Sequence, residues 1–132
     1  MLEPANQVDS AANAVIGAAL EVHRVLGPGF LETVYEEAMS VELRARGVAF
    51  ERQKPISLSY KSQPIGHGRL DLFVEPSLIV ELKAADQLLP IHQAQLMSYL
   101  KITGYPLGLL INFHERLLKN GVRRVVLSSA RA

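Results

Sequence analysis

Residues 78–84 of the chain read LIVELKA, a nearly continuous apolar run that contains two charged residues, Glu81 and Lys83. A run of this kind is typical of a central strand that is covered on both faces of a sheet. Because side chains alternate along a strand, Glu81 and Lys83 point to one face and Leu82 to the other. Charged side chains are seldom buried unless they are paired or hold a ligand, so this strand is the first candidate for a functional site.

The preceding segment predicts a partner for this strand. Residues 66–74 alternate between apolar and polar side chains, include Asp71, and end at a turn centred on residue 76. Asp71 and Glu81 are equidistant from that centre, so an antiparallel pair brings the two carboxylates together. Two carboxylates at close range repel, and a divalent cation such as Mg²⁺ relieves the repulsion. The alternative is an ion-pair network in which Lys83 neutralises the two acids.

The remaining periodicities complete the fold class. The order helix, helix, three strands, helix, two strands predicts an α/β (mixed α+β) domain, with a mixed sheet and helices on its faces. The predicted helices span 11–26, 31–46 and 90–102, and the predicted strands 56–60, 66–74, 78–84, 107–112 and 122–127. Asp9 or Ser10 is the expected cap of the first helix. Residues 1–9 are therefore expected to be disordered or extended.

Length and composition bound the possibilities further. The 132 residues predict one domain, and 48% hydrophobic with 20% charged residues excludes intrinsic disorder. The absence of cysteine excludes disulfides, zinc ribbons and thiol nucleophiles. No apolar run approaches the roughly 18 residues of a membrane span, and the N-terminus has no basic region typical of a signal peptide. We therefore expect a cytoplasmic protein that does not contact a membrane.

The net charge of +1 conceals a gradient along the chain. Residues 1–43 hold one basic and seven acidic residues, whereas residues 44–132 hold thirteen basic and six acidic residues. The C-terminal half can therefore present a positive face, with Arg123 and Arg124 as contacts for a nucleic-acid backbone. The alternative is that both sets of charges are ordinary solvated surface.

Several ordered motifs together resemble a known family. Residues 29–35 read GFLETVY, a GxxExxY pattern, and they are followed by the Asp71 strand, by Glu81-Leu82-Lys83 and by QLMSY at 95–99. Over residues 11–127 the chain resembles the GxxExxY family of the PD-(D/E)XK nuclease superfamily. This resemblance implies a restriction-endonuclease-like core, a four-stranded mixed core sheet flanked by helices, and Mg²⁺-dependent hydrolysis of phosphodiester bonds, with Mn²⁺ able to substitute.

The resemblance also implies roles for individual residues. Two acids and a glutamate of the leading helix would hold the metal: Asp71, Glu81 and Glu32. Catalysis would rest on Asp71, Glu81, Lys83 and Gln95, while Tyr99 of the Gln-x-x-x-Tyr element would contact substrate. Arg123 and Arg124 are expected substrate contacts on the charge pattern alone. One position departs from the pattern, because Leu70 stands where the motif usually has proline.

Two residues are possible accessories, and two readings of the whole chain stay open. His23 lies near the end of the first helix, and Tyr35 either packs or holds Glu32. On the helix at 90–102, Gln95 and Tyr99 share a flank that can reach the strand at 78–84, although Tyr99 can instead be core and Gln95 surface. The first reading is a nuclease acting on DNA or RNA. The alternative is a non-catalytic nucleic-acid-binding or protein-interaction domain, including a dimerisation module.

Overall fold

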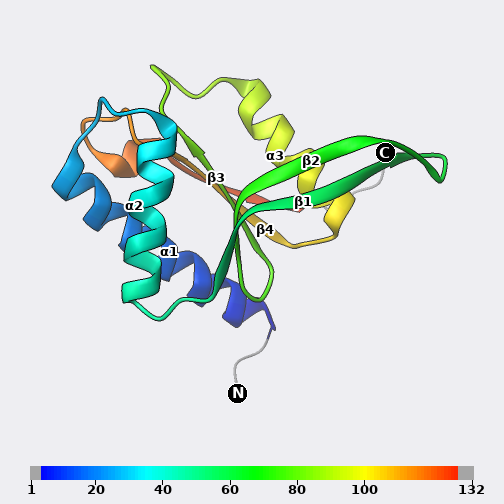
Figure 1. The fold of residues 1–132 in the computed structure, drawn as a ribbon, viewed down its shortest axis with the longest axis horizontal. Helices are drawn as coiled ribbons and strands as arrows, with labels where there is room; N and C mark the ends of the chain where they lie inside the picture. Colours follow the sequence, from blue (N-terminus) through cyan, green and yellow to red (C-terminus); the bar gives the residue numbers. More distant parts are fainter. Residues whose placement is uncertain (1–3, 128–132) are drawn as a thin grey trace.

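The computed structural model describes residues 4–127. They form a five-stranded sheet with helices on both faces (Figure 1). The predicted order of elements is confirmed. The elements are α1 (Pro4–Leu26), α2 (Glu32–Ala45), β1 (Phe50–Tyr60), β2 (Gln63–Val74), β3 (Leu78–Lys83), α3 (Pro90–Thr103), β4 (Leu107–Asn112), η1 (Leu118–Gly121) and β5 (Val122–Val126). Among the described residues, no helix combines the length and the apolar character needed to cross a membrane.

The sheet is mixed, as predicted, and its strands lie in chain order from β1 to β5. β3 and β4 are parallel, and the other neighbouring pairs are antiparallel. Parallel neighbours need a crossover connection, and α3 provides it. The sheet has one strand more than the four-stranded core that the family resemblance implied.

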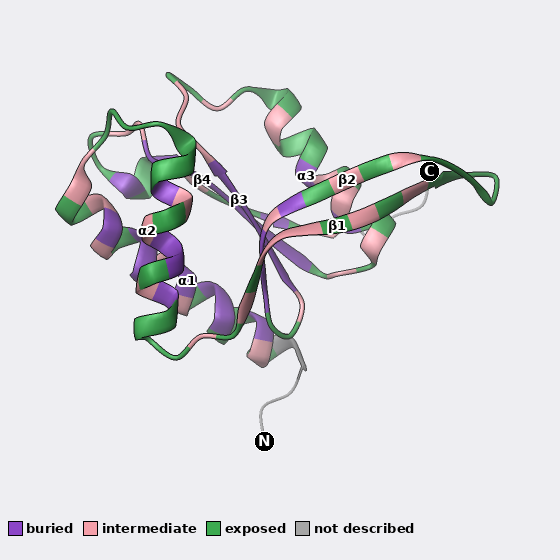
Figure 2. Cartoon of the chain, viewed as in Figure 1, coloured by how far each residue is buried: buried purple, intermediate pink, exposed green. Residues whose placement is uncertain are grey.

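Helices cover the two faces of the sheet unequally. α1 and α2 pack on one face with Leu72, Val80 and Leu82, whereas α3 packs on the other with Leu70 and Ile79. Almost every residue of β3 and β4 is buried, as the purple central strands of Figure 2 show. The apolar run at 78–84 is therefore the central strand that its composition predicts.

The prediction for the N-terminus is wrong over the residues that the structure describes there. Helix α1 already begins at Pro4, so residues 4–9 are helical, and Asp9 and Ser10 lie inside the helix rather than at its cap. Val8 explains the extension, because its side chain is only 5% exposed and belongs to the core with α2 and the sheet. Residues 1–3 lie outside the described residues.

The first hairpin is longer than predicted. β1 begins at Phe50 rather than residue 56, and β2 at Gln63 rather than residue 66. A two-residue turn with positive φ at Lys61 (48°) and Ser62 (67°) joins the strands, which is the backbone twist that tight hairpins favour. The charged start of β1 resembles a loop in sequence, and its pairing with β2 makes it a strand.

This hairpin changes faces part-way along its length. Arg52 pairs with Leu72 and Lys54 with Leu70, but Gln53 and Asp71 between them form no ladder pair. Gln53 has a φ of 51°, which twists β1 at this point. On one side of the twist Leu72 packs against α1 and α2, and on the other Leu70 packs against α3. The outer part, residues 54–70, is named the arm below; it projects past the other elements (Figure 1).

Candidate active site

Asp71 and Glu81 meet where β2 and β3 separate. The β2–β3 ladder ends at the pair of Leu72 and Val80. Beyond it, the backbone N–H of Asp71 donates to Oε2 of Glu81 at 3.0 Å, and the N–H of Leu82 donates to Oδ2 of Asp71 at 2.8 Å. The carboxylates thus accept hydrogen bonds from N–H groups released by the separating strands. The expectation that the turn brings these two acids together is confirmed.

Burial and proximity make the pair electrostatically unfavourable when both acids are charged. Glu81 is 5% exposed, and its burial, followed by the charge of Asp71, raises its pKa to about 8. Burial likewise raises the pKa of Asp71, although the Leu82 N–H opposes this shift. At neutral pH and without a cation, the pair therefore holds a proton much of the time.

Lys83 lies beside the two acids. It follows Glu81 by two residues on β3, and Leu82 between them is buried against α1 and α2, so Glu81 and Lys83 share the opposite face. The positive charge of Lys83 lowers the pKa of both Asp71 and Glu81, but by less than burial raises each of them. The lysine is therefore close enough to act at the site without neutralising it.

Helix α3 brings Tyr99 to the same place. Burial, then the charges of Glu81 and Asp71, raises the pKa of the Tyr99 hydroxyl, and the Gln95 side chain beside it opposes the shift. A Cβ built at Gly68 would lie 3.2 Å from the Tyr99 ring, so the ring rests directly on the arm. The structure therefore brings the Gln-x-x-x-Tyr element and the carboxylate pair together.

Glu32 approaches the pair from α2, on the first turn of that helix. The residue is exposed, yet partial burial of its carboxyl group, followed by the charge of Asp71, raises its pKa. Tyr35 one turn later is fully buried, and its ring stacks on Phe113 with centroids 4.4 Å apart. Tyr35 thus has a packing role, as one reading of the sequence had it.

The Tyr35 hydroxyl also holds the loop that leads to Glu32. It donates to the carbonyl of Gly27 at 2.6 Å and accepts the N–H of Phe30 at 3.2 Å. The glycines of this loop are at φ values of 68° for Gly27 and 115° for Gly29, which residues with a side chain rarely adopt. The GxxExxY segment is therefore a turn held by hydrogen bonds to Tyr35, and it places the carboxylate of Glu32 at the start of α2.

Two histidines connect the segment after β4 with its neighbours, one to α1 and one to this loop. Nε2 of His23 donates to the carbonyl of Glu115 at 2.7 Å, and Nε2 of His114 donates to the carbonyl of Phe30 at 2.9 Å. His23 is thus engaged with backbone rather than with the carboxylate pair.

The two arginines of β5 lie on opposite faces of the sheet. Arg123 pairs with Leu110, which pairs with Glu81, so Arg123 shares the face of Glu81 about 10 Å away, two strands along. Its guanidinium donates to backbone carbonyls of the preceding turn. Arg124 forms an ion pair with Asp9 of α1 at 2.8 Å and lines a hollow of about 480 Å³ at the other end of β3 and β4. Arg124 is therefore not brought to the carboxylate pair.

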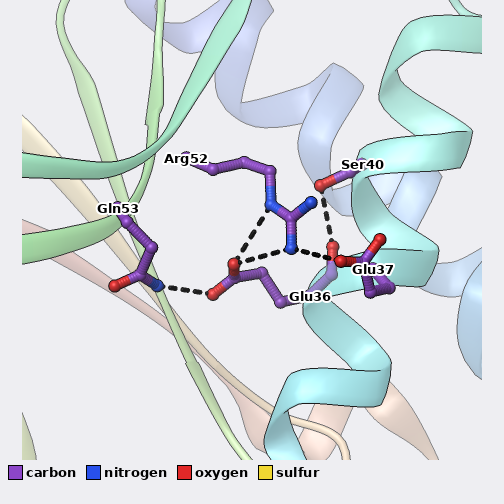
Figure 3. A network of polar contacts seen from close by, with 5 residues as sticks. All are labelled: Glu36, Glu37, Ser40, Arg52 and Gln53. Carbon is purple, nitrogen blue, oxygen red and sulfur yellow. Dashed lines mark hydrogen bonds and ion pairs between the residues drawn. The ribbon is translucent and has the colours of Figure 1, made fainter.

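A polar network that the sequence did not reveal connects α2 with β1, next to Asp71 (Figure 3). Gln53 stands opposite Asp71 and opposes the rise that burial causes in the pKa of that acid. Its Nε2 donates to Oε1 of Glu36 at 2.7 Å. Arg52 donates through Nε and Nη2 to Oε2 of Glu36 at 3.1 and 3.0 Å, and through Nη2 to Glu37 at 2.8 Å. Glu32 and Glu36 are four residues apart on one helix, and this spacing was the sequence pattern that could have placed Glu36 in the network. No such pattern pointed to Arg52 and Gln53, because the sequence of their segment resembles a loop.

Comparison with known proteins agrees with this geometry. The family model described as "PD-(D/E)XK nuclease superfamily" matches residues 9–125. The chain belongs to the PD-(D/E)XK nuclease superfamily. No curated protein gives a significant match. Among solved structures, the chain is similar to the crystal structure of SSO0001, with a TM-score of 0.58 and 16% identity.

That similarity concerns the fold. It covers 75% of this chain and 52% of the SSO0001 chain, so the present chain spans about half the length of that structure. Together with the family match, the mixed five-stranded sheet flanked by helices is consistent with a restriction-endonuclease-like fold.

The donor chemistry of the site fits a hard divalent cation such as Mg²⁺. Asp71 and Glu81 offer carboxylate oxygens, and one oxygen of each is oriented by a backbone N–H. Burial is the main reason that the pKa of both acids is raised, and a bound cation would favour their charged forms. Within residues 4–127, however, no group of three or more His, Cys, Asp or Glu side chains is arranged to hold a metal ion. The structure therefore supplies a carboxylate pair rather than a closed metal cage.

Proposed function

We propose that this chain is a metal-dependent nuclease of the GxxExxY type that hydrolyses phosphodiester bonds of nucleic acid. The observation that carries the proposal is the pair of buried carboxylates, Asp71 and Glu81, with Lys83 beside them. Membership of the PD-(D/E)XK superfamily supports the reaction class.

In this mechanism Asp71 and Glu81 would hold Mg²⁺ or Mn²⁺, and Glu32 would contribute from α2, directly or through water. The bound cation would supply a Lewis acid that polarises the scissile phosphate and lowers the pKa of water. The ammonium group of Lys83 would orient the attacking water or stabilise the negative charge that develops on the phosphate. The side chains of Gln95 and Tyr99 would position the strand, and alignment of this kind supplies much of the rate in phosphoryl transfer.

The reciprocal hydrogen bonds give the two acids a fixed orientation before any ligand binds. The N–H groups of Asp71 and Leu82 each hold one carboxylate oxygen. A ligand set that is already oriented loses little conformational entropy on binding. Gln53, which is opposite Asp71 on β1, is itself held by a hydrogen bond to Glu36 of α2.

The decisive experiment removes the charge of Lys83 and keeps its aliphatic chain. The variant Lys83→Met should fold and still respond to Mg²⁺, but should lose roughly 100-fold or more in single-turnover cleavage of its substrate. Substrates would be found first with the wild type, on a panel of single- and double-stranded DNA and RNA with Mg²⁺ or Mn²⁺. Lys101→Met, an exposed lysine of α3, is the matched control and should cleave like the wild type.

A second pair of substitutions tests the metal ligands. Mg²⁺ should raise the melting temperature of the wild type, because a ligand that binds only the folded state stabilises it. The double variant Asp71→Asn, Glu81→Gln keeps an oxygen to accept each backbone N–H, and it should fold without responding to Mg²⁺. A Mg²⁺ response that survives in this variant would show that these acids are not the ligands.

One observation favours the second candidate, a non-catalytic nucleic-acid-binding or protein-interaction domain on the same fold. The described residues offer two adjoining carboxylates and no closed set of three metal ligands. On this reading Lys83→Met mainly lowers the melting temperature, because two acids lose their nearby counter-charge. Failure of the wild type to cut any nucleic acid under any metal, together with that loss of stability, would favour the second candidate.

A further inference from the structure

The arm, residues 54–70, is an exposed two-stranded ribbon that starts at the candidate site. At one end it adjoins Asp71, and at the other it reaches the turn at Lys61. Figure 2 shows its outer half almost entirely in the colour of exposed residues. Ten residues separate the turn from Asp71, so at roughly 3.3 Å per residue the arm extends about 30 Å from the site.

The charge of the arm has one sign. Its seventeen residues contain no Asp or Glu and carry three basic side chains, Lys54, Lys61 and Arg69. Lys54 is paired with Glu51 at the base of the arm. Lys61 and Arg69 are exposed, and neither forms an ion pair with any residue in the described part of the chain. The two cations therefore stand at opposite ends of the arm, available to an anionic partner.

Register places further polar groups next to Arg69. Arg69 pairs with Pro55 and His67 with Ser57, so these side chains follow one another on a single face of the ribbon. The opposite face, through Ile56 and Leu70, packs against α3. The arm is therefore apolar toward α3, and it is polar or basic on the opposite face, which carries Arg69 and His67.

We propose that the arm contacts the backbone of a nucleic-acid duplex beyond the bond that is cut, with Arg69 nearest the site and Lys61 farthest from it. This inference rests on the proposed function and names its substrate class as double-stranded. About 30 Å corresponds to roughly nine base pairs, since a duplex carries one phosphate charge per 1.7 Å of its axis. A two-stranded ribbon also fits the width of a major groove, about 12 Å in B-DNA.

The composition of the arm favours a duplex over a single strand. Proteins that hold single strands stack successive bases on several aromatic side chains. The arm has one Phe, Tyr or Trp, which is Tyr60, and the ammonium of Lys61 lies 5.4 Å from the centre of its ring. With a single aromatic at its tip, the arm offers charge to phosphates and no stacking platform.

The test measures binding with cleavage blocked by Lys83→Met. In that background, the arm variant Lys61→Gln, Arg69→Gln is compared with Arg24→Gln, Arg46→Gln, which removes the same charge from α1 and from the end of α2. Fluorescence anisotropy with a labelled duplex of about 25 base pairs, at several salt concentrations, gives affinity and its salt dependence. A single strand of the same sequence is titrated in parallel, and melting curves check that both variants fold.

We expect the arm variant to bind the duplex about tenfold more weakly and to lose about 1.8 from the slope of log affinity against log salt, because two phosphate contacts are gone. The control should bind like its parent.

Three outcomes would overturn the inference. These are an arm variant that binds the duplex like its parent, a control that loses as much affinity as the arm variant, or a preference for the single strand. If the wild type still cuts nucleic acid in any of these cases, the arm has no such role and the proposed function stands. If the wild type neither binds nor cuts any nucleic acid, both proposals are wrong.

Discussion

Replacing Glu81 with glutamine should make the metal-free protein more stable at alkaline pH. Glu81 is buried beside Asp71, and both burial and the neighbouring charge raise its pKa from the ordinary value of 4.5 to about 8. Between these values the folded state holds a proton that the unfolded state has released. The free energy of unfolding therefore falls as the pH rises through this window, and the penalty is complete above about pH 8.

The size of the effect follows from the shift. At about 1.36 kcal/mol per pKa unit, the change from 4.5 to about 8 corresponds to roughly 5 kcal/mol. This is an upper limit for the substitution, because part of it is repulsion by Asp71, which a proton on either acid relieves. Glu81→Gln has no charge to bury, and its amide oxygen can still accept the Asp71 N–H. We therefore expect a gain of a few kcal/mol near pH 9 and almost none at pH 4.5.

Urea denaturation in EDTA at about pH 5, 7 and 9 measures this directly. The wild type should lose stability across the series relative to Glu81→Gln, and the melting temperatures should diverge by roughly 3–5 °C per kcal/mol. Glu75→Gln, in the exposed turn before β3, is the matched control and should follow the wild type. If Glu81→Gln is less stable than the wild type at pH 9, the charge of Glu81 is balanced by the protein, and the reasoning is wrong.

Other features give further predictions. Mg²⁺ should raise the melting temperature more at about pH 8.5 than at about pH 6, because the cation must displace a proton from the carboxylate pair; equal shifts would place its site elsewhere. Tyr35→Phe should lower the free energy of unfolding by about 1–3 kcal/mol in urea, since the Gly27 carbonyl and the Phe30 N–H lose their partner. Gly108→Ala should cost about 1–3 kcal/mol by the same measurement, because its Cβ would lie 2.7 Å from Leu96; a neutral result would mean that α3 yields readily.

The centre of the site was predictable because it depends on local rules. Strand alternation puts Glu81 and Lys83 on one face, and the symmetry of a short turn puts Asp71 beside Glu81. Both arguments need only a few consecutive residues. The same holds for the apolar central strand, whose composition matches its burial on both faces.

The support around the site was not predictable, because it depends on contacts between distant segments. Gln53 adopts a positive φ and bonds to Glu36, and neither fact leaves a local pattern. Arg124 similarly forms its ion pair with Asp9, 115 residues away in sequence. A charged stretch resembles a loop until its pairing partner is known, which is why the first half of β1 was missed.

The exchange of hydrogen bonds between Asp71 and Glu81 affects how relatives of this chain can be interpreted. Each carboxylate completes the main-chain bonding of a strand that has lost its neighbour, so a descendant without activity would still need an oxygen at both positions. An acid or amide at either position can therefore be retained for folding as well as for catalysis. The fold does not require Lys83 in the same way, since its side chain forms no hydrogen bond or ion pair with the part of the chain that the structure describes. Among relatives of this chain, loss of the lysine would therefore distinguish an inactive enzyme from an active one.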